Sequence, residues 1–171
     1  MGTTRDTPGR RPLLLALGAL LLAGPLVEDG YAKKPKAFLK AFVEGRRLKA
    51  WRRGGLFGTL ASASFSVAGA TKPKRGVVRT ITVTCGPVDL RTVPPATTLT
   101  GCFGSYTEAG SGPFRQWTGT GMELTVDSFD GDRLVGKFRG ELADASAANP
   151  TDASVAIDDG TFAVFLAEIG V

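Results

Sequence analysis

Few side chains in this sequence could carry out chemistry, and histidine is absent altogether. The chain therefore lacks the side chain best suited to proton transfer near neutral pH, which is also the commonest metal ligand. Glu108, Glu123 and Glu141 are the candidate carboxylates for glycoside hydrolysis, a reaction that needs two of them in one cleft. No spacing brings two together, and no S-x-x-K nucleophile motif occurs. We expect no enzyme, no cofactor and no metal site, with a small carboxylate-dependent hydrolase as the alternative.

An acidic stretch, Asp127 to Asp132, is the one segment with the composition of a calcium loop. Its spacing differs from that of an EF-hand, and no bidentate glutamate follows in register. Aspartate and glycine are also the residues that hairpin tips favour. The segment is therefore interpreted as a turn.

Cys85 and Cys102 are the only cysteines of the chain. In an exported protein, two cysteines indicate a single disulfide, and without histidine they would make a poor zinc site. Closing a loop of this length should stabilise the fold by about 3 kcal/mol.

Trp117 stands where aromatic and polar side chains gather, with Arg115 just before it and Tyr106 on the preceding segment. Strand alternation puts Trp117 on the same face as Glu123, which we expect to be the outer face. An exposed tryptophan of this kind could stack on a glycan or on a partner's side chain. The other interpretation is that the N-terminal segment or a loop covers it.

Positive charge is concentrated in one short segment. Residues 33–54 contain nine Lys or Arg and one Glu, whereas residues 55–171 contain nine basic and twelve acidic residues. The apolar residues of 37–53 approximate the stripe of a short helix, imperfectly, because Gly45 interrupts it. The candidate contacts with an anionic surface are Lys33, Lys34, Lys36, Lys40, Arg46, Arg47, Lys49, Arg52 and Arg53. The alternatives are a solvated linker or a helix docked on the body.

The first 32 residues have the organisation of a secretory signal peptide. Arginines precede an apolar run from Leu13 to Ala23, and Gly30-Tyr31-Ala32 offers small residues for cleavage. The run is shorter than the roughly 20 residues that span a bilayer. We expect export to the periplasm or medium, no transmembrane span in the mature chain, and no nucleic-acid partner.

Beyond residue 55 the apolar residues alternate with period two, which predicts strands. Strands are expected at 57–67, 77–85 and 98–106, with a proline-rich connection at 86–97. A further hairpin is expected to turn at 129–131.

The two C-terminal hairpins can be assigned registers. A three-residue loop at 129–131 would place Val126 opposite Leu134 and Glu123 opposite Lys137. A second hairpin is expected to turn at Asp159-Gly160, because Ile157 and Phe162 differ in parity and Asp-Gly favours two-residue turns.

The sequence thus predicts an all-β protein: a single antiparallel β-sandwich, or a small barrel, of six to seven strands. The expected organisation is a signal peptide at 1–32, a basic arm at 33–55 and the β domain at 56–171. The segments Val135–Gly140 and Val155–Phe162 resemble small bacterial secreted and lipoprotein β-sandwich domains of uncharacterised function. This resemblance implies a fold and carries no site residues.

The expected function is that of an exported binding or structural protein of the cell envelope, whose basic arm contacts an anionic surface or glycan. A loop-presenting inhibitor built on the stapled Pro94-Pro95 segment is a third hypothesis. The sequence does not indicate an oligomeric state.

Overall fold

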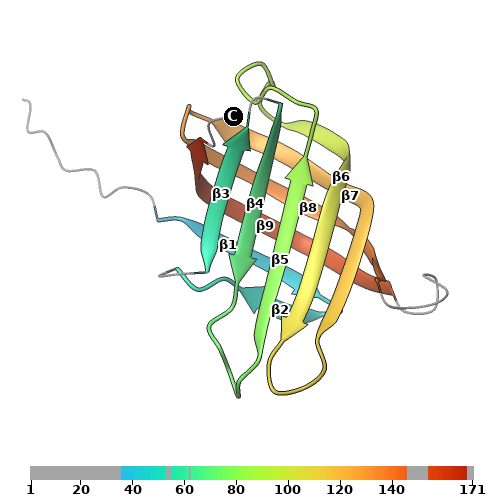
Figure 1. Ribbon diagram of the computed structural model, residues 1–171. Coiled ribbons are helices and arrows are strands. Elements are labelled where there is room, and N and C mark those ends of the chain that lie inside the picture. Colours follow the sequence, from blue (N-terminus) through green and yellow to red (C-terminus); the bar gives the residue numbers. More distant parts are fainter. Residues whose placement is uncertain (1–35, 53–54, 62, 146–153, 169–171) are drawn as a thin grey trace, which may run out of the picture. The chain divides into compact units, whose positions relative to one another are not determined.

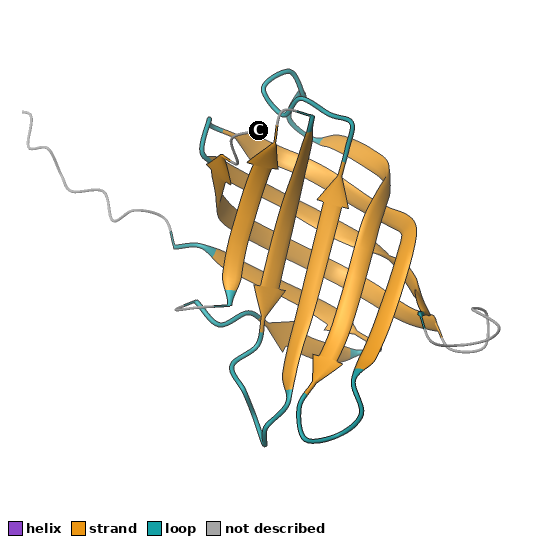
Figure 2. Ribbon diagram, in the orientation of Figure 1, coloured by secondary structure: helices purple, strands orange, loops and turns teal. Residues whose placement is uncertain are grey.

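The computed structural model describes residues 36–52, 55–61, 63–145 and 154–168, and they form nine strands and no helix (Figures 1 and 2). The strands are β1 (Phe38–Val43), β2 (Arg46–Lys49), β3 (Leu56–Ala61), β4 (Ser64–Ala70), β5 (Val78–Cys85), β6 (Thr97–Ala109), β7 (Arg115–Phe129), β8 (Arg133–Asp144) and β9 (Ser154–Glu168). The all-β prediction is confirmed. The described residues accordingly contain no apolar helix that could cross a membrane.

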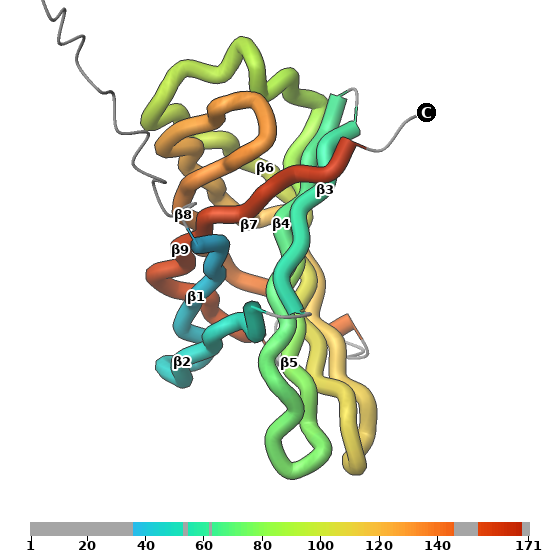
Figure 3. The backbone as a smooth tube through the Cα atoms, turned by 90° about the vertical axis from the view of Figure 1, so that its left-hand side faces the viewer, coloured from blue at the N-terminus to red at the C-terminus, as the bar shows by residue number. Residues whose placement is uncertain are grey.

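All nine strands belong to one sheet with the order β2-β1-β9-β3-β4-β5-β6-β7-β8, and β9 also pairs with β8. The sheet therefore closes on itself. One edge of β9 pairs with β8, while the other pairs first with β1 and then, in parallel, with β3. The expectation of six to seven purely antiparallel strands is wrong on both counts, since β3 and β9 run parallel. In Figure 3, β1, β2, β8 and β9 lie on one side of the enclosed core and β3 to β5 lie on the other.

The core lies on the inner face of this closed sheet. Large side chains from nearly every strand fill it, and they have relative exposures of 2% or less. They include Leu39, Phe65, Ile81, Met122, Leu124, Leu134, Phe138, Ile157 and Phe162.

The N-terminal basic segment is a β-hairpin of this sheet rather than a helical arm. Leu39, Ala41 and Val43 are buried, and the residues between them face outward. Glu44 and Gly45 have φ angles of 48° and 69°, as a two-residue type I′ turn requires. The glycine that interrupts the expected helix is thus the turn residue. Pairing of β1 with β9 on one side and with β2 on the other gives the backbone of β1 strand partners on both edges.

Residues 57–67, expected as one strand, form the hairpin β3–β4, with Leu60 opposite Phe65. The predicted strand at 77–85 and the irregular connection after Cys85 are confirmed. The strand expected at 98–106 is also present but continues to Ala109.

The β7–β8 hairpin forms, but its register differs from the expected one. Leu124 lies opposite Phe138, and Glu123 lies opposite Arg139 instead of Lys137. The register shifts between Val126 and Ser128, next to the turn. Next to the turn Phe129 lies opposite Leu134, and beyond the one-residue bulge Val126 lies opposite Gly136. Leu124 and Phe138 therefore share the inner face, as the parity argument required, but Leu124 pairs two residues away from its expected partner, Gly136.

The last predicted hairpin does not exist, because β9 runs straight through Asp159-Gly160 as one 15-residue strand. Here β9 carries one extra residue relative to both β1 and β8, and Asp159 has a φ of 47°. A bulge of this kind reverses the inward parity just as a two-residue turn would. The Asp-Gly pair therefore bends the strand instead of ending it.

A disulfide joins Cys85, at the end of β5, to Cys102 in β6, as predicted, with a Cα–Cα distance of 4.5 Å. It closes the proline-rich connection between these neighbouring strands. The described residues contain no free cysteine.

Replacing both cysteines, as Cys85→Ala with Cys102→Ala, should lower the free energy of unfolding by about 3 kcal/mol, because the 17-residue loop is no longer constrained in the unfolded chain. Urea unfolding measures the change. Wild-type protein unfolded under reducing conditions serves as the control and should match the variant. Equal unfolding free energies for oxidised wild type and variant would contradict the prediction.

Gly160→Ala should destabilise the fold by about 1–3 kcal/mol through overpacking. A β-carbon at Gly160 would lie 2.5 Å from Cδ2 of Phe138, whose ring is buried. Gly112→Ala is the matched control, since nothing lies within 4 Å of its added methyl group. Urea unfolding measures the free energy of unfolding of both variants. Similar decreases in the two would refute overpacking against Phe138 as the cause.

Candidate functional site

One end of the closed sheet carries a row of charged side chains on its inner face. Arg79 of β5 lies opposite Glu108 of β6, and Glu108 lies opposite Arg115 of β7. In the next inward pair, Tyr106 lies opposite Trp117, and their ring centroids are 5.4 Å apart. Both side chains are buried, with relative exposures of 4% for Tyr106 and 9% for Trp117. The charged row therefore lies directly above the aromatic end of the core.

Residues of the β1–β2 hairpin and of this row together line a pocket of about 270 Å³. Its lining contains four arginines and two glutamates. The charged lining residues are Glu44, Arg46, Arg47, Arg79, Glu108 and Arg115. Val43, Leu48, Val155, Tyr106 and Trp117 give the same pocket an apolar floor.

Glu108 organises one side of the pocket. Its Oε1 accepts a hydrogen bond from Arg79 Nε at 2.7 Å and another from the Tyr106 hydroxyl at 2.8 Å. The Arg79 hydrogen bond is the main reason that the pKa of Glu108 is lowered. The same hydrogen bond raises the pKa of Arg79. The pKa of the Tyr106 phenol is raised mainly by burial and, to a smaller extent, by its own hydrogen bond to Glu108. The network keeps Glu108 ionised and fixes Arg79.

The other three arginines of the pocket are not neutralised in this way. Among the described residues, no carboxylate lies within 4.0 Å of the guanidinium groups of Arg46, Arg47 or Arg115. Arginine forks pair in two-pronged fashion with carboxylate and phosphate groups. The arrangement can therefore hold a small anion over an apolar floor.

Trp117 does not lie on the outer face, so its predicted exposure is wrong; it is buried together with Tyr106. β7 has one extra residue between Thr118 and Glu123, relative to both β6 and β8. This bulge reverses the parity, so that Trp117 faces inward together with Met122 and Leu124. Arg115 stays exposed at the pocket mouth, and the three residues are together, as expected, but inside a pocket.

The nine basic candidates separate into three groups. Arg46 and Arg47 line the pocket. Lys36, Lys40, Lys49 and Arg52 belong to the described hairpin segment but not to the pocket lining. Lys33, Lys34 and Arg53 lie outside the described residues, as do the predicted signal peptide and all but the first two residues of the loop expected at 144–153.

Sequence reasoning missed Arg79, and it considered Glu108 only as a candidate carboxylate for hydrolysis, not as a partner of Arg79 in a pocket. A signal for both was available, because Arg79 precedes buried Ile81 by two positions and Glu108 follows buried Tyr106 by two. Extending the alternation of each strand by one step places both side chains on the inner face.

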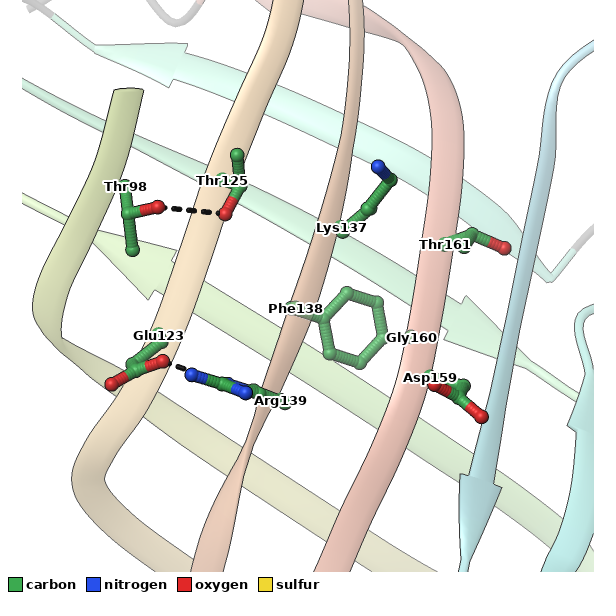
Figure 4. Close-up of a pocket in the computed structure, with 9 residues that line it drawn as sticks. All are labelled: Thr98, Glu123, Thr125, Lys137, Phe138, Arg139, Asp159, Gly160 and Thr161. Carbon is green, nitrogen blue, oxygen red and sulfur yellow. Dashed lines mark hydrogen bonds and ion pairs between the residues drawn. The ribbon is translucent and has the colours of Figure 1, made fainter. Parts of the chain in front are cut away.

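A second, larger hollow of about 550 Å³ lies on the outer face across β6 to β9 (Figure 4). Its polar groups largely satisfy one another. Glu123 binds Arg139 at 2.8 Å, the hydroxyls of Thr98 and Thr125 are 2.9 Å apart, and Lys137 lies 3.8 Å from Asp127. The ring of Phe138 beneath is only 2% exposed. This hollow offers fewer free groups than the arginine-lined pocket.

The acidic stretch at 127–132 comprises the last residues of β7 and the turn at 130–132 that leads into β8. Asp130 accepts a hydrogen bond from the backbone N–H of Arg133 at 2.9 Å, and Asp127 faces Lys137. In the described part of the chain, no group of three or more potential ligand side chains could hold a metal ion.

Comparison with protein-family models, curated proteins and solved structures finds no match to this chain. The resemblance of its C-terminal segments to small bacterial β-sandwich domains stays a prediction. Function must therefore be argued from the geometry of the site.

Glu108→Gln should remove a pH-dependent part of the stability. Because the folded state lowers the pKa of Glu108 below 4.5, its contribution is complete above that value and disappears as the pH falls through the folded pKa. The contribution should be about 1 kcal/mol or less, since the Arg79 side chain is 41% exposed. Urea unfolding between pH 3 and 7, sampled at about unit intervals, measures it.

The control for this prediction is the same substitution in an Arg79→Gln background. There the pH-dependent difference should shrink, since the hydrogen bond from Arg79 is its main cause. A stability difference that grows on acidification would contradict the assignment.

Proposed function

We propose that this chain is an exported binding protein that holds a small anionic molecule in the arginine-lined end pocket. The observation that carries the proposal is the convergence of four arginines and only two glutamates on an apolar floor. The row on the inner face carries Arg79 and Arg115 against Glu108 alone, so it has an excess of positive charge. A bound anion would balance that excess.

The composition of the pocket indicates the class of ligand. Guanidinium groups recognise carboxylate or phosphate, and their attraction is stronger beside a buried floor than in open water. Leu48, Val155 and Trp117 favour an apolar part on the same molecule. At about 270 Å³ the pocket is just below the usual range of about 300–1,000 Å³, so the ligand must be small.

Export is supported by the disulfide, since such bonds persist in oxidising compartments. The predicted signal peptide at 1–32 would supply the route. We place the protein in the periplasm or the medium of a bacterial envelope, where it acts without catalysis.

The alternative, a carboxylate-dependent hydrolase, has less support. Glu108 faces inward, whereas Glu123 binds Arg139 at the outer-face hollow and Glu141 is exposed. A general acid needs a raised pKa, and that of Glu108 is lowered. The candidate carboxylates thus do not form the pair that hydrolysis requires.

Trp117 provides the readout for a binding test. The chain has two tryptophans, so a Trp51→Phe background leaves Trp117 at the pocket floor as the only one. Benzoate or phenyl phosphate should change its fluorescence with saturation, whereas benzyl alcohol, which lacks the charge, should not. Arg115→Gln should weaken anion binding about tenfold, equivalent to about 1.4 kcal/mol.

The control variant is Arg91→Gln, an exposed arginine that pairs with Glu168 away from the pocket lining. It should leave the affinity unchanged. Equal responses to the charged and neutral probes, or equal losses in the two arginine variants, would refute an anion site here.

A further inference from the structure

The outward face of the β1–β2 hairpin combines positive charge with exposed aromatic rings. Lys40 lies opposite Lys49, and Phe42 lies opposite Arg47. Phe42 is 39% exposed, and Trp51, just after β2, is 41% exposed. The alternate residues are buried in the core, so the sheet fixes which side chains face outward.

The charges on this face are available to a partner. Residues 36–52 contain six Lys or Arg and one Glu. The salt bridges formed among described residues all lie outside this segment. No described carboxylate therefore forms an ion pair with the basic side chains of the hairpin, and Lys40 Nζ lies 5.3 Å from the centroid of the Phe38 ring.

The aromatic rings indicate which kind of anionic partner fits. A soluble polyanion would need the cations alone. Exposed Phe42 and Trp51 cost free energy in water, and rings of this kind surrounded by Lys and Arg suit the headgroup region of a bilayer. The basic residues would meet the lipid phosphates at the same depth.

We propose that this face, consisting of Lys40, Phe42, Lys49 and Trp51, docks on an anionic phospholipid surface. Phe42 and Trp51 enter the headgroup region, and the two lysines pair with phosphate groups. This proposal is independent of the ligand pocket, because none of these four residues belongs to the pocket lining.

Sedimentation with vesicles tests the proposal, using protein recovered from the extracytoplasmic fraction with its N-terminus defined by intact mass. All variants share that N-terminus, so any contribution from residues before 36 cancels. We expect binding to phosphatidylglycerol–phosphatidylcholine vesicles, weakening with salt, and little binding to pure phosphatidylcholine. Far-UV circular dichroism and thermal unfolding of each variant verify folding.

The decisive variants change one property each. Lys40→Gln with Lys49→Gln should weaken binding about 30-fold, since each basic residue near the surface contributes about fivefold. Phe42→Ser with Trp51→Ser should weaken it by about tenfold or more. In wild type, Trp51 fluorescence should shift to the blue on binding, a signal that Trp117→Phe leaves in place.

Matched controls lie elsewhere on the surface. Lys72→Gln with Lys74→Gln removes two exposed charges, and Phe114→Ser removes a ring that is 62% exposed. Both should bind as wild type does. Salt-insensitive binding, absence of binding, or equal losses in control and hairpin variants would overturn the proposal.

A soluble polyanion is distinguished in the same series. If heparin binds as tightly as the vesicles and only the lysine variant weakens both, the face recognises charge alone and the membrane assignment is wrong. Arg115→Gln should leave vesicle binding intact, so failure of the pocket proposal and failure of this one are separable.

Discussion

Closure of the sheet by β9 is the constraint on which the other features depend. This strand pairs with β8 along one edge and with β1 and β3 along the other, so it gives three strands their backbone partners. Without it β8 and β3 would be open edges, and the basic hairpin would have no strand to join. Closure also creates an inside, and the core and the arginine-lined pocket occupy that inside. The pocket lies at one end of the closed sheet, beyond the last layer of core side chains.

Two β-bulges determine which side chains reach the interior. In β7 an extra residue turns Trp117 inward, and in β9 an extra residue at Asp158-Asp159 lets Ile157 and Phe162 share the core although their parity differs. Each bulge re-aims the residues beyond it without interrupting the sheet. The aromatic floor of the pocket exists only because of the first bulge. A bend in a strand thus decides what the site can bind.

The β1–β2 hairpin has a different chemistry on each side. Its inner residues complete the core, the start of β2 supplies Arg46 and Arg47 to the pocket, and its outer face carries lysines and exposed rings. Such a strongly basic segment at the open edge β2 also discourages edge-to-edge association with other chains. The positive charge of the hairpin thus opposes strand pairing with other chains and could recognise anions on both of its faces. These properties are consistent with a binding role, which needs no catalytic group.

Much of this protein follows from local rules that the sequence displays. Period-two alternation identified the β class and several strands, and the count of cysteines identified the disulfide. The grouping of Trp117, Tyr106 and Arg115 was also visible. What the sequence could not provide was any choice between structures that satisfy the same local pattern. A change of parity at Asp159-Gly160 fits a turn or a bulge equally well, and only the long-range pairing of β9 with β1, β3 and β8 selects the bulge. The basic segment could form an imperfect helix or a strand, and the strand prevails because β9 offers it backbone partners. Local sequence therefore determined composition, alternation and covalent linkage, whereas pairing between distant segments decided which faces turn inward and hence what forms the pocket.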